Sequence, residues 1–182
     1  MKITRFCVRT PLCSVIFWVV FLTLLPDSRA RLFSDDASNL QQHSAQVFVS
    51  NLKWEKYILE EVNRLREAKG LVPLRLNPKA QAAARNHSLD MARLGYFSHR
   101  DLEGRLVDDR LRQVKLGPWK GIAENIAKCD ASSNPAQQTV DGWTKSPGHA
   151  KNMFNPQYNE TGIGAVLDAD GAVLFCQVFV VR

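Results

Sequence analysis

The sequence predicts an α+β fold in which several helices surround a small antiparallel sheet. Apolar residues recur at helical spacing over 54–65 and again over 78–94, which is typical of amphipathic helices. Near the end of the chain, 162–181 contains two β-rich runs about a turn at 168–171. Since 182 residues suffice for one domain with appended segments, we expect a single mixed domain that ends in a hairpin.

The N-terminal segment has the features of an export signal. A basic start precedes an apolar run over 12–25, which is shorter than the roughly 20 residues that a membrane span needs. Pro26 ends the run, and small residues lead to Ala30. We predict that 1–30 is a signal peptide cleaved after Ala30, so that the mature protein has no membrane span and is secreted, extracellular or periplasmic. The alternative is an uncleaved anchor that tethers the protein to a membrane.

Removal of the predicted signal changes the charge of the protein. The formal net charge of the whole chain is +6, and the mature chain keeps 20 basic and 17 acidic residues, or +3. These charges are mixed along the predicted helices, and no basic cluster is interleaved with aromatic residues. Both observations argue against a nucleic-acid partner.

Two cysteines, Cys129 and Cys176, remain in the predicted mature chain. In an oxidising compartment they could form a disulfide that closes a loop of about 48 residues, which the chain-entropy model values at roughly 4 kcal/mol. Two isolated buried thiols are the alternative. We expect the disulfide.

The helices have recognisable ends. Residues 31–52 show no sustained period and are predicted to be a linker, so we place the domain at 53–182. Gly70 ends the first helix. The second begins at Pro78, with Asn77 as its N-cap, and Gly95 closes it.

The second half of the domain is predicted less regularly. A third helix is expected over 106–116, and 121–129 is compatible with a strand or a tight connection. A further helix begins at Pro135, after Asn134 as a cap, and one or two helical turns begin at Pro147.

Three polar residues stand out as candidates for a site. His99 follows a helix end and His149 begins a short helix, and such turn-rich positions often carry function. Glu124 lies in the apolar stretch GIAENIA, where a buried carboxylate needs a partner such as an imidazole. Two imidazoles and a carboxylate could also surround a zinc ion, although their 25-residue spacings match no local metal motif.

The remaining polar candidates favour packing over chemistry. His87 lies on the apolar stripe of its helix and is predicted to line the core, with Asp90 as its partner. Ser98 adjoins His99, and Ser146 lies three residues before His149. Because the chain has no GxSxG motif, a serine nucleophile is disfavoured.

Several stretches, in this order, resemble the CAP superfamily of cysteine-rich secretory, antigen 5 and pathogenesis-related proteins, in its short bacterial form. They are ILEEVNRLREAKGLVPLRLNPKAQAAARNHSLDMARLGYFSH, AENIA, VDGWTKSPGHAKNMFNPQYNETGIG and LFCQVFV. The resemblance covers roughly 53–181. It implies a three-layer α-β-α sandwich, with the antiparallel sheet between helices and a central cleft.

In the family the cleft is lined by two histidines and two glutamates, and the histidines can bind zinc or another divalent ion. The resemblance places His99, Glu124 and His149 at three of these positions, and Ser146 stands where the second glutamate is expected. A second departure is Ala123, where the family has glycine. Asn63 and Arg66 match an N-x-x-R pattern of the family, for which the resemblance implies a structural role.

The roles reported for the family range from sterol or lipid binding to defence and proteolysis. We expect a secreted, non-enzymatic binding module with a cleft formed by His99, Glu124, Ser146 and His149. We expect the two histidines to hold zinc or another divalent cation weakly, and the protein to engage a lipid or sterol, a cell-wall component or a protein. The alternative is a metal-dependent peptidase, with Glu124 as the general base.

Overall fold

The computed structural model describes residues 52–131 and 134–182. The predicted signal peptide and most of the predicted linker lie outside these residues. Within them, no helix is long and apolar enough to cross a membrane. Residues 52–67 are helical. The elements that follow are β1 (Arg75–Leu76), α2 (Pro78–Leu94), α3 (Val107–Gln113), β2 (Gly121–Asp130), α4 (Pro135–Lys145), α5 (Pro147–Met153), β3 (Glu160–Leu167) and β4 (Ala172–Val181).

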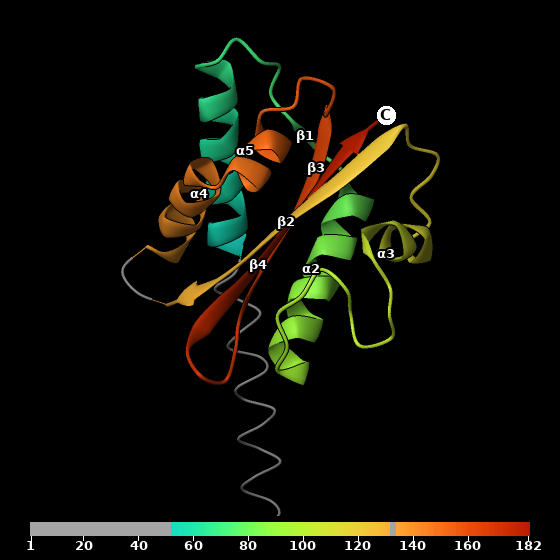
Figure 1. Ribbon diagram of the computed structural model, residues 1–182, viewed down its shortest axis with the longest axis vertical. Coiled ribbons are helices and arrows are strands. Elements are labelled where there is room, and N and C mark those ends of the chain that lie inside the picture. Colours follow the sequence, from blue (N-terminus) through green and yellow to red (C-terminus); the bar gives the residue numbers. More distant parts are fainter. Residues whose placement is uncertain (1–51, 132–133) are drawn as a thin grey trace, which may run out of the picture.

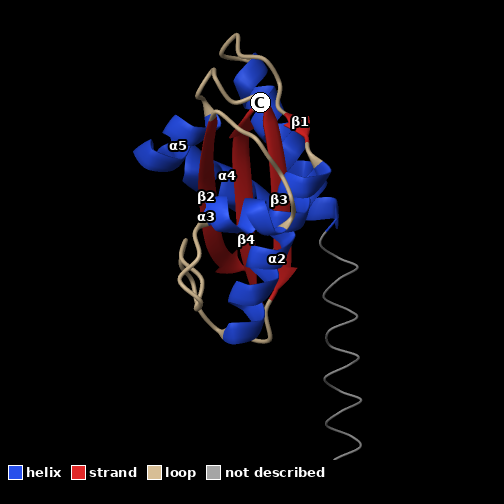
Figure 2. Cartoon of the chain, turned by 90° about the vertical axis from the view of Figure 1, so that its right-hand side faces the viewer, coloured by secondary structure: helices blue, strands red, loops and turns tan. Residues whose placement is uncertain are grey.

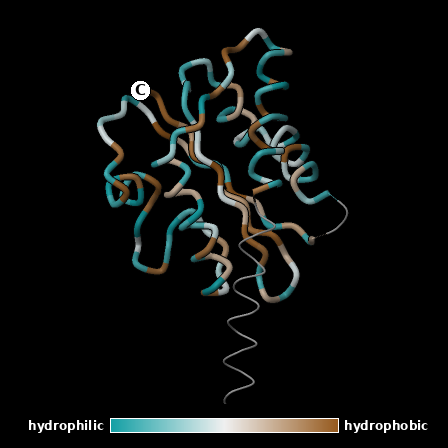
Figure 3. Tube along the Cα trace, turned by 180° about the vertical axis from the view of Figure 1, so that it is seen from behind, coloured by the Kyte–Doolittle hydropathy of each residue, from teal (hydrophilic) through white to brown (hydrophobic). Residues whose placement is uncertain are grey.

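The elements form three layers. Figure 1 shows the sheet nearly edge-on, with the 52–67 helix, α4 and α5 on one side and α2 and α3 on the other. Figure 2 shows the strands side by side between these helices. Each face of the sheet has its own apolar cluster, one containing Ile58, Val140 and Trp143 and the other Ala84 and Met91. Hydrophobic residues follow the central strands (Figure 3). The expected sandwich of helices about a sheet is therefore confirmed.

The strand order is β1-β3-β4-β2. β4 pairs antiparallel with both β3 and β2, as expected for a terminal hairpin with a further strand beside it. β1 pairs parallel with β3, so the sheet is mixed rather than wholly antiparallel. The extended connection before α2 produces this pairing, since Arg75 donates to the Asn159 carbonyl and Asn77 to that of Thr161. β2 is an edge strand, with β4 as its one neighbour among the described residues.

Local capping chemistry sets the helix ends. The Asn77 side chain accepts hydrogen bonds from the first turn of α2, and Gly95 closes that helix at φ 67°, both as predicted. Asn134 caps α4 in the same way. α3 is shorter than the predicted 106–116. Lys115 adopts φ 56° and ends the helical path, although the apolar pattern continues to the buried Leu116.

The approach of α2 to the sheet depends on two glycines in β3. A Cβ atom at Gly162 would overlap the backbone of Ala80, and one at Gly164 would overlap that of Ala84. The small residues on both elements therefore let α2 lie directly on the strand.

Arg66 is fully buried, and its guanidinium donates to main-chain carbonyls of distant loops. Its acceptors include the carbonyls of Val72 at 3.0 Å, Met153 at 2.6 Å and Tyr158 at 3.1 Å. Asn63 exchanges two hydrogen bonds with the backbone of Leu74. These contacts agree with the structural role that the family resemblance implies.

The predicted disulfide is wrong, because the two thiols are free and lie on opposite faces of the sheet. Cys176 lies directly across from Ile126, and Cys129 is three residues further along β2. Since side chains alternate along a strand, an odd step places Cys129 on the other face. The Cys129 thiol lies 3.6 Å from the Pro135 carbonyl, and Cys176 is fully buried. The two thiols are separate, as in the alternative of two isolated buried thiols, but only Cys176 is buried and Cys129 is half-buried.

Candidate functional site

Glu124 lies in the middle of β2 and is 8% exposed. Its Oε1 atom accepts a hydrogen bond from Nδ1 of His99 at 2.8 Å. Its Oε2 atom accepts from Nη2 of Arg110 at 2.6 Å and from the Cys176 thiol at 3.4 Å. The structure thus brings His99 and Glu124 together, and it engages both carboxylate oxygens.

Arg110 is the partner that the sequence did not reveal. It lies in α3, is 4% exposed, and also donates at 3.1 Å to the main-chain carbonyls of His99 and Arg105. Burial raises the pKa of Glu124, but the His99 hydrogen bond and the Arg110 charge outweigh it and hold that pKa below its ordinary value. Glu124 is therefore an ionised, paired carboxylate at neutral pH.

The imidazole of His99 is half exposed, and Glu124 sets its orientation. An ionised carboxylate can only accept a hydrogen bond, so Nδ1 of His99 carries the proton that is donated. In the neutral form of the ring, the other nitrogen, Nε2, then has its lone pair free for a ligand. A carboxylate behind a histidine commonly fixes a metal-binding or ligand-binding imidazole in this way.

His87 lines the core as predicted, with a different partner from the one expected. Its Nε2 atom lies 3.0 Å from the Ser98 carbonyl, and the Tyr96 hydroxyl lies 3.5 Å from its Nδ1 atom. Asp90 makes no described contact with it. Burial lowers the pKa of His87, so its ring is neutral and donates to the Ser98 carbonyl. His87 therefore fixes the segment 96–99, which carries His99.

His149 lies in the first turn of α5, with its ring centroid 6.4 Å from that of Trp143. Burial and the nearby His99 lower the pKa of His149. Its carbonyl accepts from Nδ2 of Asn125 at 3.1 Å, and the Asn125 Oδ1 atom accepts from Asn152 at 2.9 Å. Asn125 thus ties α5 to β2. The one signal in the sequence for this role of Asn125 was its position directly after Glu124.

A cleft of about 360 Å³ lies between these parts of the molecule. Ser146 and His149 line it, as expected, whereas Glu124 is not among the lining residues because its side chain is buried on the other face of β2. His99 follows the lining residue Phe97 by two positions. The full lining is Phe97, Ile126, Ala127, Lys128, Cys129, Gln138, Thr139, Gly142, Trp143, Ser146 and His149.

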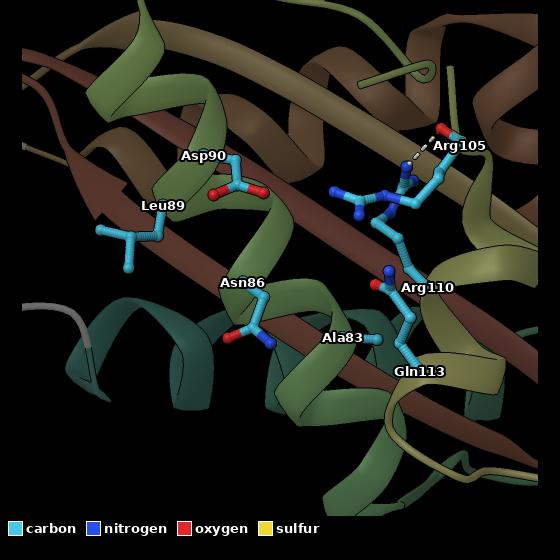
Figure 4. Close-up of a pocket in the computed structure, with 7 residues that line it drawn as sticks. All are labelled: Ala83, Asn86, Leu89, Asp90, Arg105, Arg110 and Gln113. Carbon is cyan, nitrogen blue, oxygen red and sulfur yellow. Dashed lines mark hydrogen bonds between the residues drawn. The ribbon is translucent and has the colours of Figure 1, made fainter. Parts of the chain in front are cut away.

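A smaller cavity of about 180 Å³ lies between α2 and α3 (Figure 4). Asn86 and Asp90 line it from α2, and Arg110 lines it from α3. Figure 4 also shows the hydrogen bond between Arg110 and the Arg105 carbonyl. Arg110 therefore borders this cavity while its guanidinium pairs with Glu124.

The donor set does not fit a tightly held metal ion. Among the described residues, no group of three or more His, Cys, Asp or Glu side chains is arranged to hold one. Glu124 is disfavoured as a third ligand because both of its oxygens already accept hydrogen bonds, one of them from an arginine. A tight zinc site takes three or four protein ligands, so His99 and His149 alone supply too few. Weak binding by these two imidazoles stays a prediction.

A sequence profile described as the CAP, Cysteine-rich secretory protein family, matches residues 59–181. The chain belongs to the CAP family. The match spans His99, Glu124 and His149, the three residues that the sequence resemblance assigned to the family's cleft. Arg110 and Asn125 are the further residues through which this CAP domain holds the two histidines in place.

Two proteins of Bacillus subtilis are similar to more than half of this chain. The uncharacterized protein YkwD of Bacillus subtilis (strain 168) is 32% identical over 113 residues, which are 62% of this chain and 42% of that protein. The uncharacterized membrane protein YlbC of the same strain is 34% identical over 123 residues, or 64% of this chain and 34% of that protein. This chain thus matches less than half the length of either relative.

Two solved structures are also similar. One is an extracellular protein containing a SCP domain from Bacillus anthracis str. Ames, with a TM-score of 0.64 and 29% identity over 72% of this chain and 41% of that chain. The other is an outer surface protein from Borrelia burgdorferi, with a TM-score of 0.64 and 18% identity over 71% of this chain and 93% of that chain. At 18% identity the second likeness concerns the fold alone.

Proposed function

We propose that this CAP-domain chain is a secreted, non-enzymatic binding module whose cleft takes a ligand between Phe97 and His149. One observation carries the proposal. Both oxygens of Glu124 are engaged by His99, Arg110 and Cys176. The carboxylate is therefore a positioning group for His99, and three of its roughly four acceptor sites are already occupied.

The same observation counts against the peptidase alternative, which needs Glu124 as a general base. A useful general base has a pKa near the working pH and reaches the proton that it removes. The pKa of Glu124 is lowered instead, and an arginine already neutralises its charge. Removal of a proton by Glu124 would have to break the ion pair with Arg110.

Secretion is supported by the predicted cleavage after Ala30 and by the extracellular description of the similar Bacillus anthracis protein. His149 in the cleft lining and the nearby His99 are the ligands that would hold a divalent ion. Such an ion would supply positive charge for an acidic group of the ligand. Because two imidazoles bind weakly, we expect the ion to exchange readily.

The metal part of the proposal is tested by titration calorimetry with zinc on the exported protein. We expect weak binding by the wild type and at least a tenfold loss in His99→Ala and in His149→Ala. Lys151→Ala, an exposed neighbour in α5, is the matched control and should bind as the wild type does. Identical zinc binding by all four proteins would show that the cleft histidines hold no ion.

The non-enzymatic part needs a separate experiment. The wild type and Glu124→Gln are incubated with a peptide library, with and without a chelator, and the products are identified by mass spectrometry. We expect no cleavage by either protein. Cleavage by the wild type that is lost in Glu124→Gln or with the chelator would replace the binding module with the peptidase.

A further inference from the structure

We infer that the ligand of the cleft is an extended, acidic peptide segment that adds to the free edge of β2 at Lys128. This inference rests on the proposed function, because it names the ligand class of the same cleft. It concerns the main-chain N–H and C=O groups of the cleft floor, which have no part in the roles proposed for the histidines and Glu124.

The hydrogen-bond pattern of β2 shows which backbone groups face its free edge. Ala131 donates to the carbonyl of Gly171, and these two residues continue the ladder by one step beyond its last pair, Asp130 and Ala172. In an antiparallel ladder every second residue exchanges hydrogen bonds with its partner, so the odd-numbered residues of β2 bond to β4. The N–H and C=O groups of Glu124, Ile126 and Lys128 therefore point away from β4.

Side chains cover one part of this edge and leave another part open. Nδ2 of Asn152 lies 3.4 Å from the Glu124 carbonyl, and Nε1 of Trp143 donates to the Ile126 carbonyl at 3.2 Å. Among the described residues, no side chain and no other element bonds to the N–H or C=O of Lys128. An open strand edge of this kind is a template for pairing with another chain.

The open edge coincides with the floor of the cleft. Residues 126–129 form that floor, with Phe97 on one wall and Trp143 and His149 on the other. The Phe97 side chain is exposed, and no described residue of another element covers it fully. The Lys128 ammonium lies 3.0 Å from the Asp168 carboxylate, and Lys128 as a whole residue is exposed.

Backbone chemistry favours a peptide over a lipid at this position. An acyl chain that displaced water would leave the N–H and C=O groups of Lys128 without partners, at a cost of about 1–3 kcal/mol for each buried group. An extended peptide satisfies both groups and places alternate side chains against the walls. Its apolar side chains would pack between Phe97 and Trp143.

Charge narrows the class of peptide. The cleft lining contains Lys128 and His149 and has no Asp or Glu side chain. His99 and Arg100 follow Phe97 by two and three positions in the sequence and are exposed. Among the lining residues a basic peptide would meet only side chains of its own sign or neutral ones, whereas a carboxylate would meet the partly exposed Lys128 ammonium.

The test uses an array of synthetic eight-residue peptides in which apolar and acidic residues alternate, and copies with N-methyl groups on alternate amides. Lys128→Pro removes the edge N–H without removing a bond to β4, since proline is tolerated where the N–H faces outward. Lys128→Arg is the matched control that keeps both the N–H and the positive charge. Gly142→Leu narrows the cleft, because a Cβ there meets nothing within 4 Å.

We expect the wild type and Lys128→Arg to bind the peptides, and Lys128→Pro and Gly142→Leu to bind at least tenfold more weakly. N-methylation in the pairing register should cause a similar loss with the unaltered protein, so the test does not depend on the folding of any variant. Equal binding of methylated and unmethylated peptides, or full binding by Lys128→Pro, overturns strand pairing.

Two further outcomes separate this inference from the proposed function. In the first, the wild type binds a fluorescent fatty acid but no peptide, and Gly142→Leu loses this binding. That result would overturn the proposal of a peptide ligand and would still agree with a binding module. In the second, the wild type is a dimer and Lys128→Pro is a monomer. That result would mean that the edge of β2 pairs with a second copy of this chain, and it would also overturn the proposal of a peptide ligand. If peptide, fatty acid and zinc all fail to bind, the proposed function itself fails.

Discussion

Glu124 and Asn125 are neighbours in β2, yet they hold the two walls of the cleft by different chemistry. Glu124 faces α2 and α3 and fixes His99 within an ion pair with Arg110. Asn125 faces α5 and fixes its His149 end with neutral amide bonds. One wall therefore depends on ionisation and the other does not. Substitutions and changes of pH should therefore affect the stability of the two walls differently.

The largest effect is expected on the ionised wall. Arg110→Ala leaves the buried Glu124 carboxylate without its arginine, and loss of one member of a buried pair costs about 3–5 kcal/mol. Urea unfolding monitored by circular dichroism measures this loss. Arg112→Ala, in the same helix and mostly exposed, should change the free energy of unfolding by less than about 0.5 kcal/mol. Equal stabilities of the two variants would mean that Glu124 does not need Arg110.

A smaller loss is expected on the neutral wall. Asn125→Ala removes the amide that joins β2 to α5, and unmet buried hydrogen bonds cost about 1–3 kcal/mol. The same unfolding assay applies, with the exposed Asn86→Ala as the asparagine control. A loss as large as that of Arg110→Ala would remove the contrast between the walls.

The dependence of the free energy of unfolding on pH should come mainly from the ionised wall. Burial lowers the pKa of His87, so the unfolded chain takes up the proton first and the free energy of unfolding falls as pH drops below about 6.5. The slope for one proton is at most about 1.4 kcal/mol per pH unit. His87→Gln should flatten the curve of unfolding free energy between about pH 5 and 7.

The partly exposed His149 is the comparison for that measurement. Its pKa is lowered as well, but less of its ring is removed from water, so His149→Gln should flatten the curve less. A curve that flattens more in His149→Gln than in His87→Gln would assign the acid sensitivity to the neutral wall.

The smallest effect concerns the two thiols, one on each face of the sheet. Because Cys129 and Cys176 are not bonded to each other, a reducing agent should leave the melting temperature unchanged. Differential scanning fluorimetry with and without reductant measures this. A fall of several degrees with reductant would show that a disulfide stabilises the protein.

Local chemistry made much of the fold predictable from sequence. Asn77 and Gly95 mark the two ends of α2, and Asn134 caps α4. These ends were predictable because a cap acts within one or two turns. Arg110 and Asn125 were missed, since their partners are set by how α3 and α5 meet β2. The predicted disulfide failed for a similar reason. Which face of the sheet Cys129 occupies depends on strand pairing, and the sequence left 121–129 open between a strand and a tight connection.

The glycines of β3 have a consequence for the cleft. Gly162 and Gly164 let α2 lie against the strand, and His87 projects from that same helix to the Ser98 carbonyl. An added methyl group at either glycine would lift the helix and draw His87 away from the segment that carries Phe97 and His99. Two positions with no side chain, deep in the sheet, thus act as a spacer that sets the width of the opening at the surface.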